Sequence, residues 1–208
     1  MKENSQKKYI PRRWDKSLAD FLGDASPNKN VLLVEGARQV GKSSLVCNAL
    51  ANVGCVSYSL NLERDTRLCS LIDECREFHD FEAVLRDRVG FDPARGEVLF
   101  IDEAQESRRL GGFVRFMKEE WPRASVILSG STLARLFRED QRYPVGRVNR
   151  VVVGPFCFSE FLEAIGEEHL AKVIRSEVRD ISPQRHCRLL ELYDDFLKTG
   201  GLPAVVLS

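Results

Sequence analysis

Residues 34–46, with the sequence VEGARQVGKSSLV, connect a short aliphatic run to a segment in which apolar residues have helical spacing. Gly36 and Gly41 bracket four residues of this connection, and Lys42 and Ser43 follow at once. Glycines allow a loop to curl until its backbone N–H groups point inward, and the following helix adds its positive end. The pattern predicts a phosphate-binding loop between a buried strand and a helix, which restricts the chain to an α/β fold.

The two residues after the second glycine have different expected roles. Lys42 reaches the outer phosphates as a point charge, and the Ser43 hydroxyl is suited to Mg²⁺. A strand-to-helix turn without a ligand would explain the glycines, but not a lysine and a serine at this offset. We therefore expect the whole loop to contact a nucleotide. Its candidate binding residues are Gly36, Ala37, Arg38, Gln39, Val40, Gly41, Lys42, Ser43 and Ser44.

Five short segments with the pattern of strands alternate along the chain with segments of helical spacing, and the first of them, NVLLVE, is a continuous aliphatic run. Continuous apolar runs of this length are typical of strands that are buried on both faces of a parallel sheet. The alternation predicts a three-layer α/β fold, in which helices cover both faces of a mainly parallel five-stranded sheet. The expected strands are residues 30–35, 55–62, 98–101, 125–128 and 149–153.

The composition changes near Pro155, after which aliphatic strands give way to helical patterns alone. We expect a core domain at residues 1–155 and a small helical lid at residues 156–208. Apolar side chains between Phe158 and Phe196 recur at helical spacing, a stripe that is far more often a core than a recognition groove.

Residues 98–105, VLFIDEAQ, place two acids directly after an aliphatic strand. Ligands of α/β folds lie at the carboxyl ends of the strands, so Asp102 is expected to hold Mg²⁺ there. Glu103 is placed to polarise a water that attacks the terminal phosphate. Adjacent acids after a strand also occur as solvated loop residues or helix N-caps. Together with the phosphate loop, the pair favours hydrolysis.

A second polar strand end occurs in residues 125–132, SVILSGST. Ser129 is the first candidate, and Ser131 the second, for a side chain that contacts the terminal phosphate or holds the attacking water. The alternative is that Ser-Gly-Ser only turns the chain. The guanine signature Asn-Lys-x-Asp does not occur in the sequence, which makes ATP the expected nucleotide.

Lysine and arginine together number 31, and so do aspartate and glutamate. This balance gives no overall attraction to nucleic acid or to an anionic membrane. No apolar run approaches the ~18 residues of a membrane span, and the basic start lacks the apolar core of a signal peptide. We therefore expect a cytoplasmic protein. Its six cysteines form no Cys-x-x-Cys pair, so buried free thiols are expected rather than a zinc site.

Several segments together resemble a known family. In chain order they are YIPRRW, GARQVGKSSL, YSLNLE, LFIDEAQ, ILSGST, GRVNRVVVGPFCFSEFL and GGLP. The series resembles prokaryotic AAA-family ATPases, in which the AAA domain precedes a C-terminal domain of unknown function. The likeness spans nearly the whole chain, and the last two segments are its most specific parts. It implies the P-loop NTPase fold, ATP and Mg²⁺ as cofactors, and a chain that normally continues beyond GGLP.

The resemblance also implies roles for particular residues. The family's acidic pair falls on Asp102 and Glu103, and its polar strand-end residue falls on Ser129. Ser43 stands where threonine is common and keeps the hydroxyl. The arginine of the family's Gly-Arg pair falls on Arg147, which would reach the nucleotide of a neighbouring subunit in a homo-oligomer, act in its own subunit, or pair with a lid carboxylate. The resulting catalytic set is Lys42, Glu103, Ser129 and Arg147, and the metal ligands are Ser43 and Asp102.

The segment YIPRRW is the expected adenine site, because this region packs near the base in related ATPases. Ile10 and Pro11 would line the base, and Arg12 would flank it. The alternative is that Arg12 and Arg13 form a surface arginine pair on an N-terminal arm.

Two functions share these residues, with ATP and ADP as ligands of both. The first is Mg²⁺-dependent ATP hydrolysis coupled to a conformational change of a protein partner or of an appended C-terminal domain. The second is an ATP-gated switch in signalling or defence that hydrolyses slowly. A small-molecule kinase is disfavoured by Glu103, which suits activation of water rather than of a second substrate.

Overall fold

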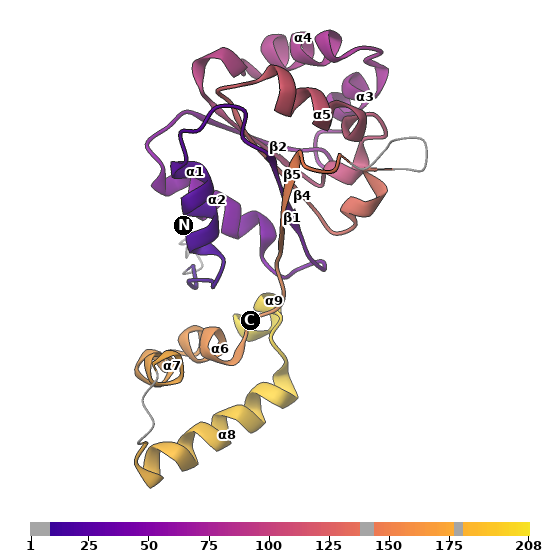
Figure 1. Ribbon diagram of the computed structural model, residues 1–208. Helices are drawn as coiled ribbons and strands as arrows, with labels where there is room; N and C mark the ends of the chain where they lie inside the picture. Colours follow the sequence, from indigo (N-terminus) through magenta and orange to yellow (C-terminus); the bar gives the residue numbers. More distant parts are fainter. Residues whose placement is uncertain (1–8, 138–143, 177–180) are drawn as a thin grey trace, which may run out of the picture.

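The computed structural model describes residues 9–137, 144–176 and 181–208 (Figure 1). Its strands are β1 (Val31–Glu35), β2 (Ser57–Asn61), β3 (Val98–Asp102), β4 (Ser125–Gly130) and β5 (Val148–Val152). They form a five-stranded sheet in the order β2-β3-β4-β1-β5. Every neighbouring pair is parallel, which confirms the predicted α/β fold with a mainly parallel five-stranded sheet.

Helices cover both faces of the sheet and complete three layers (Figure 1). They are α1 (Asp15–Gly23), α2 (Lys42–Asn52), α3 (Thr66–Glu74), α4 (Phe78–Val89) and α5 (Leu110–Glu120). α1 and α2 pack on one face, and α3, α4 and α5 pack on the other. The helical pattern over residues 64–89 is divided into α3 and α4, because Cys75 is extended and a capping box of Glu77 and Asp80 starts a new helix.

The alternation of side chains along a strand explains how one sheet supports two cores. On β1, Leu33 packs with α3, α4 and α5, whereas Leu32 and Val34 pack with α1 and α2. Successive strand residues point to opposite faces, so a strand that is covered on both sides must be apolar throughout. The continuous apolar run in the sequence is the direct result of this double burial.

The strand order brings the polar strand ends together. β1 lies between β4 and β5, and β3 is the other neighbour of β4. Glu35 is paired with Gly130, and Asn61 is paired with Asp102. All strands run in one direction, so their carboxyl ends share the edge from which the phosphate loop leaves β1. Short 3₁₀ turns are η1 (Pro93–Arg95), η2 (Ala104–Glu106) and η3 (Leu133–Arg135).

After β5, the described chain contains helices without further strands. They are α6 (Phe158–Ala164), α7 (Glu168–Arg175), α8 (Pro183–Thr199) and α9 (Pro203–Val206). Figure 1 shows the chain leaving the sheet through α6 and α7, and α8 leading back to α9, which lies beside the end of β5. The lid has a small core of its own, made by Leu162, Leu170, Ala171, Leu189 and Leu192. The division into a core at 1–155 and a lid at 156–208 stays a prediction.

All six cysteines are free thiols, but only Cys75 is buried. Cys47, Cys55 and Cys187 are exposed, so the expectation of buried thiols is wrong for these three. Cys47 and Cys187 lie on helices, where apolar neighbours in sequence face a different side, and Cys55 precedes β2.

Within the three described ranges, no helix has the length and apolar character that a membrane crossing requires.

Candidate functional site

The loop between β1 and α2 has a backbone shape that its glycines allow. Gly41, directly before α2, has a φ of 89°, in the left-handed region that residues with a Cβ rarely adopt. Gly36 lies so close to Val153 that an added Cβ would be 2.1 Å from the Val153 carbonyl oxygen. The loop is therefore curled and packed closely against the chain that follows β5.

Lys42 points back into the loop. It is 5% exposed, and its Nζ donates hydrogen bonds to the carbonyl oxygens of Gly36, at 3.0 Å, and Ala37, at 2.9 Å. Burial lowers the pKa of Lys42 from its ordinary value, while the nearby carboxylates of Glu103 and Asp102 oppose this shift. An ammonium held among carbonyl groups is placed to exchange these partners for phosphate oxygens.

The carboxylate of Asp102 joins three side chains at the carboxyl edge of the sheet. Its Oδ2 accepts hydrogen bonds from Ser43 Oγ at 2.7 Å and from Asn61 Nδ2 at 3.1 Å. Its Oδ1 accepts a hydrogen bond from Ser129 Oγ. Asp102 thus connects the start of α2 with the ends of β2 and β4. Sequence reasoning missed Asn61, although a polar residue at the end of YSLN gave the signal.

The Ser43 hydroxyl and the Asp102 carboxylate form an oxygen pair suited to Mg²⁺. This ion prefers oxygen ligands and keeps several waters, so one hydroxyl and one carboxylate are a sufficient contribution from the protein. The 2.7 Å hydrogen bond between Ser43 and Asp102 brings both oxygens to one point beside the phosphate loop. The residues present therefore fit the metal that the loop implies.

Glu103 follows β3 in a left-handed conformation, with a φ of 51°. Few non-glycine residues adopt this conformation, which turns the chain sharply at the strand end. The residue precedes η2, but its side chain makes no capping hydrogen bond to that described turn. Instead, Glu103 lines the same cavity as Lys42, and its Oε2 accepts a hydrogen bond from Gln105 Nε2 at 2.6 Å.

Gln105 is a site residue that sequence reasoning missed. It is 9% exposed, and its Oε1 has no hydrogen-bond partner within the described part of the chain. This oxygen lies against Gly130 at the end of β4, where an added Cβ would be 2.0 Å from it. Gly130 thus leaves room for the glutamine that holds Glu103.

The two serine candidates on the β4 side have different surroundings. Ser129 is fully buried and directs its hydroxyl at Asp102. It is not among the described residues that line the cavity. The Ser131 hydroxyl lies 3.4 Å from that of Thr132 in an exposed turn. The structure thus brings Ser129 to the site as a partner of Asp102, not as a side chain that faces a terminal phosphate.

A cavity of about 790 Å³ lies between the phosphate loop, the N-terminal arm and the lid. This volume is within the range of small-molecule binding sites. The predicted loop residues that line it are Arg38, Gln39, Gly41, Lys42, Ser43 and Ser44. The other three, Gly36, Ala37 and Val40, contribute carbonyl groups that bind Lys42 and Arg12.

Of the two residues predicted to line the adenine base, only one lines the cavity. Ile10 is buried and lines the cavity together with Phe156 from the chain after β5. Pro11 is exposed and is not among the described residues that line the cavity, so the structure does not place it where it would contact the base. Adjacent residues of a non-helical segment face different ways, and only one of this pair faces inward.

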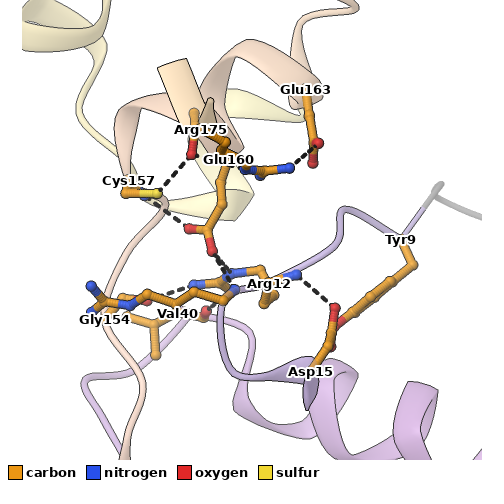
Figure 2. A network of polar contacts seen from close by, with 11 residues as sticks. Tyr9, Arg12, Asp15, Val40, Gly154, Cys157, Glu160, Glu163 and Arg175 are labelled. Atoms are coloured by element: carbon orange, nitrogen blue, oxygen red, sulfur yellow. Dashed lines mark hydrogen bonds and ion pairs between the residues drawn. The ribbon is translucent and has the colours of Figure 1, made fainter. Parts of the chain in front are cut away.

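Arg12 is buried, which excludes the surface alternative for this residue. It is 6% exposed and pairs with Glu160 of α6 (Figure 2). Arg13, by contrast, is exposed, and its guanidinium carbon lies 4.1 Å from the centroid of the Trp14 ring. Arg12 lines the cavity, but protein groups engage its guanidinium, which is therefore not free to flank a base.

Arg147 lies at the opposite end of the sheet from the phosphate loop. Its carbonyl oxygen accepts a hydrogen bond from the N–H of Val31, where β1 begins. Its Nε donates to Glu119 Oε1 at 2.8 Å, near the end of α5. Two of the three expected roles are corrected by this placement, because Arg147 is remote from the nucleotide site of its own chain and its carboxylate partner is not in the lid. Contact with a neighbouring subunit's nucleotide stays a prediction.

The loop and the sheet together define the class of the protein. A phosphate-binding loop leaves a central parallel strand, and an acid-tipped strand ends beside it, an arrangement that belongs to P-loop α/β nucleotide-binding proteins. A family model described as an AAA domain matches residues 28–162, more than half of the chain. The chain therefore belongs to the AAA domain family of P-loop ATPases.

Among solved structures, the chain is similar to a chain in the structure of Drosophila ORC bound to DNA, with a TM-score of 0.48 and 16% sequence identity. The likeness covers 88% of this chain and 55% of that chain, so this chain spans about half the length of that relative. No curated protein sequence matches. Membership of the AAA family supports nucleotide binding and hydrolysis in general terms.

Proposed function

We propose that this protein binds ATP with Mg²⁺ and hydrolyses it, and that hydrolysis drives a conformational change in a protein partner or an appended domain. The observation that carries the proposal is that Lys42 and Glu103 line one cavity of about 790 Å³. A cation for the outer phosphates and a carboxylate for the attacking water thereby share one space of nucleotide size.

Nucleotide binding depends on an exchange of partners at Lys42. Its ammonium leaves the carbonyl oxygens of Gly36 and Ala37 and binds oxygens of the outer phosphates, which are stronger, charge-assisted acceptors. Loop N–H groups and the N-terminus of α2 add further donors. The adenine base is assigned to the apolar part of the lining, which includes Ile10 and Phe156.

Ser43 and Asp102 are the residues that would hold Mg²⁺. Bound there, the ion neutralises negative charge on the phosphate oxygens. Asn61 and Ser129 each donate a hydrogen bond to one oxygen of Asp102, so they fix the direction in which this carboxylate faces.

Glu103 serves as the general base of the proposed reaction. Its carboxylate accepts a proton from water while the water oxygen attacks the terminal phosphorus of ATP. The bond from that phosphorus to the bridging oxygen breaks, and ADP and inorganic phosphate are the products. Gln105 orients the base through its 2.6 Å hydrogen bond to Glu103.

A slow ATP-gated switch is the second candidate, and the contact between Gln105 and Glu103 favours it. The Gln105 amide engages the Glu103 carboxylate at 2.6 Å, so a water has to compete with this amide before it transfers a proton. In such a protein the bound ATP, rather than its turnover, provides the signal to a partner.

Release of inorganic phosphate from ATP, followed over time in Mg²⁺ and in EDTA, tests both candidates. Sustained Mg²⁺-dependent release that is lost in Glu103→Gln supports the ATPase. Tight ATP binding by calorimetry, with release below one phosphate per protein over the time course, supports the switch. A protein that binds no ATP under either condition refutes both.

A further inference from the structure

Arg12 connects three segments that lie far apart in the sequence (Figure 2). Its Nη1 donates a hydrogen bond at 2.9 Å to the carbonyl oxygen of Val40, which precedes Gly41 in the phosphate loop. Its Nη2 donates at 2.8 Å to the carbonyl oxygen of Gly154, after β5. Its Nε lies 3.3 Å from Oε1 of Glu160 in α6. One side chain of the N-terminal arm thus contacts the loop, the strand end and the lid.

The ion pair between Arg12 and Glu160 is buried on both sides. Arg12 is 6% exposed, and Glu160 is 1% exposed. Glu160 also accepts hydrogen bonds from the backbone N–H groups of Cys157, at 2.9 Å, and Arg13, at 3.0 Å. Separation of such a pair would leave a charge without its partner in the interior. The loop, the arm and α6 are therefore constrained to move together while the pair is intact.

Contacts continue from Arg12 to the segment before α9. The Arg12 guanidinium carbon lies 4.8 Å from the centroid of the Phe156 ring, a cation–π contact. The N–H of Phe156 donates a hydrogen bond at 2.7 Å to the carbonyl oxygen of Gly201. A Cβ on Gly201 would be 2.3 Å from the Phe156 carbonyl oxygen, so only glycine permits this approach. Gly201, the second glycine of the GGLP segment, thereby allows the chain before α9 to pack directly against the backbone of Phe156.

The segment 203–207, which we call the roof, returns to the phosphate loop. Pro203, Ala204 and Leu207 of the roof line the same cavity as Lys42. Pro203 Cγ lies 3.9 Å from the position that a Cβ on Gly41 would take. The contacts therefore run from the loop through Arg12 to the roof, and the roof in turn faces the loop.

We propose that Arg12 is a positioning residue that links nucleotide binding at the phosphate loop to the placement of the roof. The inference rests on the proposed function, because it requires a nucleotide in the cavity. The Val40 carbonyl and the Gly41 N–H belong to one rigid peptide plane. A phosphate that binds this N–H therefore orients the carbonyl that Arg12 holds, and Arg12 carries the change to Phe156 and Glu160.

The planar guanidinium allows one side chain to make all three polar contacts. A lysine keeps the charge, but its single nitrogen cannot reach three acceptors that are spread around a guanidinium plane. Arg12→Lys therefore tests the three contacts of Arg12 without a change in its charge. Arg13→Lys is the matched control, because Arg13 is adjacent and exposed and its guanidinium lies on the Trp14 ring.

Backbone hydrogen exchange of the full chain, with and without ATP and Mg²⁺, tests the link. In the parent protein we expect ATP to slow exchange in the loop, residues 36–44, and also in lid residues 156–164 and 200–207. In Arg12→Lys, protection of the loop should remain and protection of the lid should be lost. ATP should bind this variant about tenfold more weakly, as typical coupling free energies imply. Arg13→Lys should behave as the parent does.

Two results would overturn the link: protection of the loop without the lid in the parent, or equal protection of the lid in Arg12→Lys. No ATP-dependent protection of the parent loop would instead refute nucleotide binding, and the link with it. If thermal unfolding shows that Arg12→Lys does not fold, Glu160→Gln replaces it, because the amide keeps the shape of glutamate and removes its charge. Lost lid protection in Glu160→Gln supports the link, and retained protection overturns it.

Discussion

Gln105 Nε2 lies 2.6 Å from Oε2 of Glu103, and the oxygen of the same Gln105 amide lies against Gly130 of β4. The amide that holds the carboxylate assigned as general base is therefore packed against the neighbouring strand, without a hydrogen bond to its described residues. Glu103 also has a left-handed backbone, which is adopted by few side chains unless the surrounding structure supports it. The position of Glu103 relative to the phosphate loop thus depends on a residue that does not itself line the described cavity.

We expect Gln105→Leu to slow ATP hydrolysis by about tenfold to a hundredfold with unchanged ATP affinity, because displacement of a general base by about 1 Å has effects of this size. The free energy of unfolding should change by less than about 1 kcal/mol, since leucine also removes an amide oxygen without a partner among the described residues. Single-turnover hydrolysis and urea unfolding measure the two quantities. Faster hydrolysis would show that Gln105 restrains Glu103, as the switch requires.

Glu103→Gln should bind ATP as the parent does and hydrolyse it about a hundredfold more slowly, because an amide keeps the shape of the side chain but accepts no proton. Phosphate release in a single turnover is the measurement. Glu120→Gln is the control, since Glu120 is exposed at the end of α5 and is not among the described residues of the cavity lining. Equal rates in Glu103→Gln and the parent would remove Glu103 from the mechanism.

Gly36→Ala should weaken ATP binding and lower the free energy of unfolding by about 1–3 kcal/mol. The added Cβ would meet the backbone oxygen of Val153 at 2.1 Å, and a backbone atom cannot rotate away as a side chain does. Gly54→Ala is the matched control, because no described atom lies within 4 Å of its added Cβ. Urea unfolding and calorimetry with ATP compare the two variants. Equal stabilities would contradict the close packing of the loop against the end of β5.

Lys42→Ala should weaken ATP binding by about a hundredfold, because hydrogen bonds to charged groups contribute about 1.5–3 kcal/mol each. Calorimetric titration with ATP and with ADP measures the loss, which should be larger for ATP. Lys16→Ala is the control, since Lys16 is exposed on α1. An unchanged preference for ATP over ADP in Lys42→Ala would show that Lys42 does not contact the terminal phosphate.

Local sequence patterns predict the central strands because β1, β3 and β4 are mainly apolar runs that are buried on both faces. The edge strands β2 and β5 contain polar residues and are partly exposed, so their patterns are weaker. Local patterns also predict the phosphate loop, whose residues are consecutive in the chain and whose glycines have a steric cause at Gly36 and Gly41. Asp102 follows from the same reasoning, since a polar residue that ends a buried parallel strand must lie at the carboxyl edge. These features depend on short stretches of sequence.

Arg12 and Arg147 show where local patterns are insufficient. Arg12 belongs to an arginine pair that is typical of a solvated arm, yet it bonds to Gly154, 142 residues away along the chain. Such a partner is determined by the arrangement of the lid on the core, and no local pattern contains it. Arg147 precedes a strand, and a parallel strand begins at the edge opposite the loop, so its distance from the site follows from the direction of β5.

In the single chain, Arg147 is a partner of Glu119. Their hydrogen bond is the main cause that lowers the pKa of Glu119 from its ordinary value. A carboxyl group whose pKa is lower in the folded than in the unfolded protein stabilises the folded state at pH values above its ordinary pKa. This stabilisation is lost as the pH falls through the lowered pKa. Arg115 is exposed and pairs with the same carboxylate, so Arg115→Ala also removes a partner of Glu119 and serves as the control for Arg147→Ala.

Mixing of variants decides whether Arg147 also acts across a subunit interface. A guanidinium that neutralises charge on the terminal phosphate in trans contributes about three to five decades in rate, so Arg147→Ala should be nearly inactive whereas Arg115→Ala keeps its activity. Addition of the binding-deficient Lys42→Ala chain should then restore hydrolysis, because one chain donates the arginine and the other holds the ATP. The rate per subunit of the parent should also rise with protein concentration, since sites form as subunits associate. A rate that is independent of concentration, together with no rescue on mixing, would restrict Arg147 to its ion pair with Glu119.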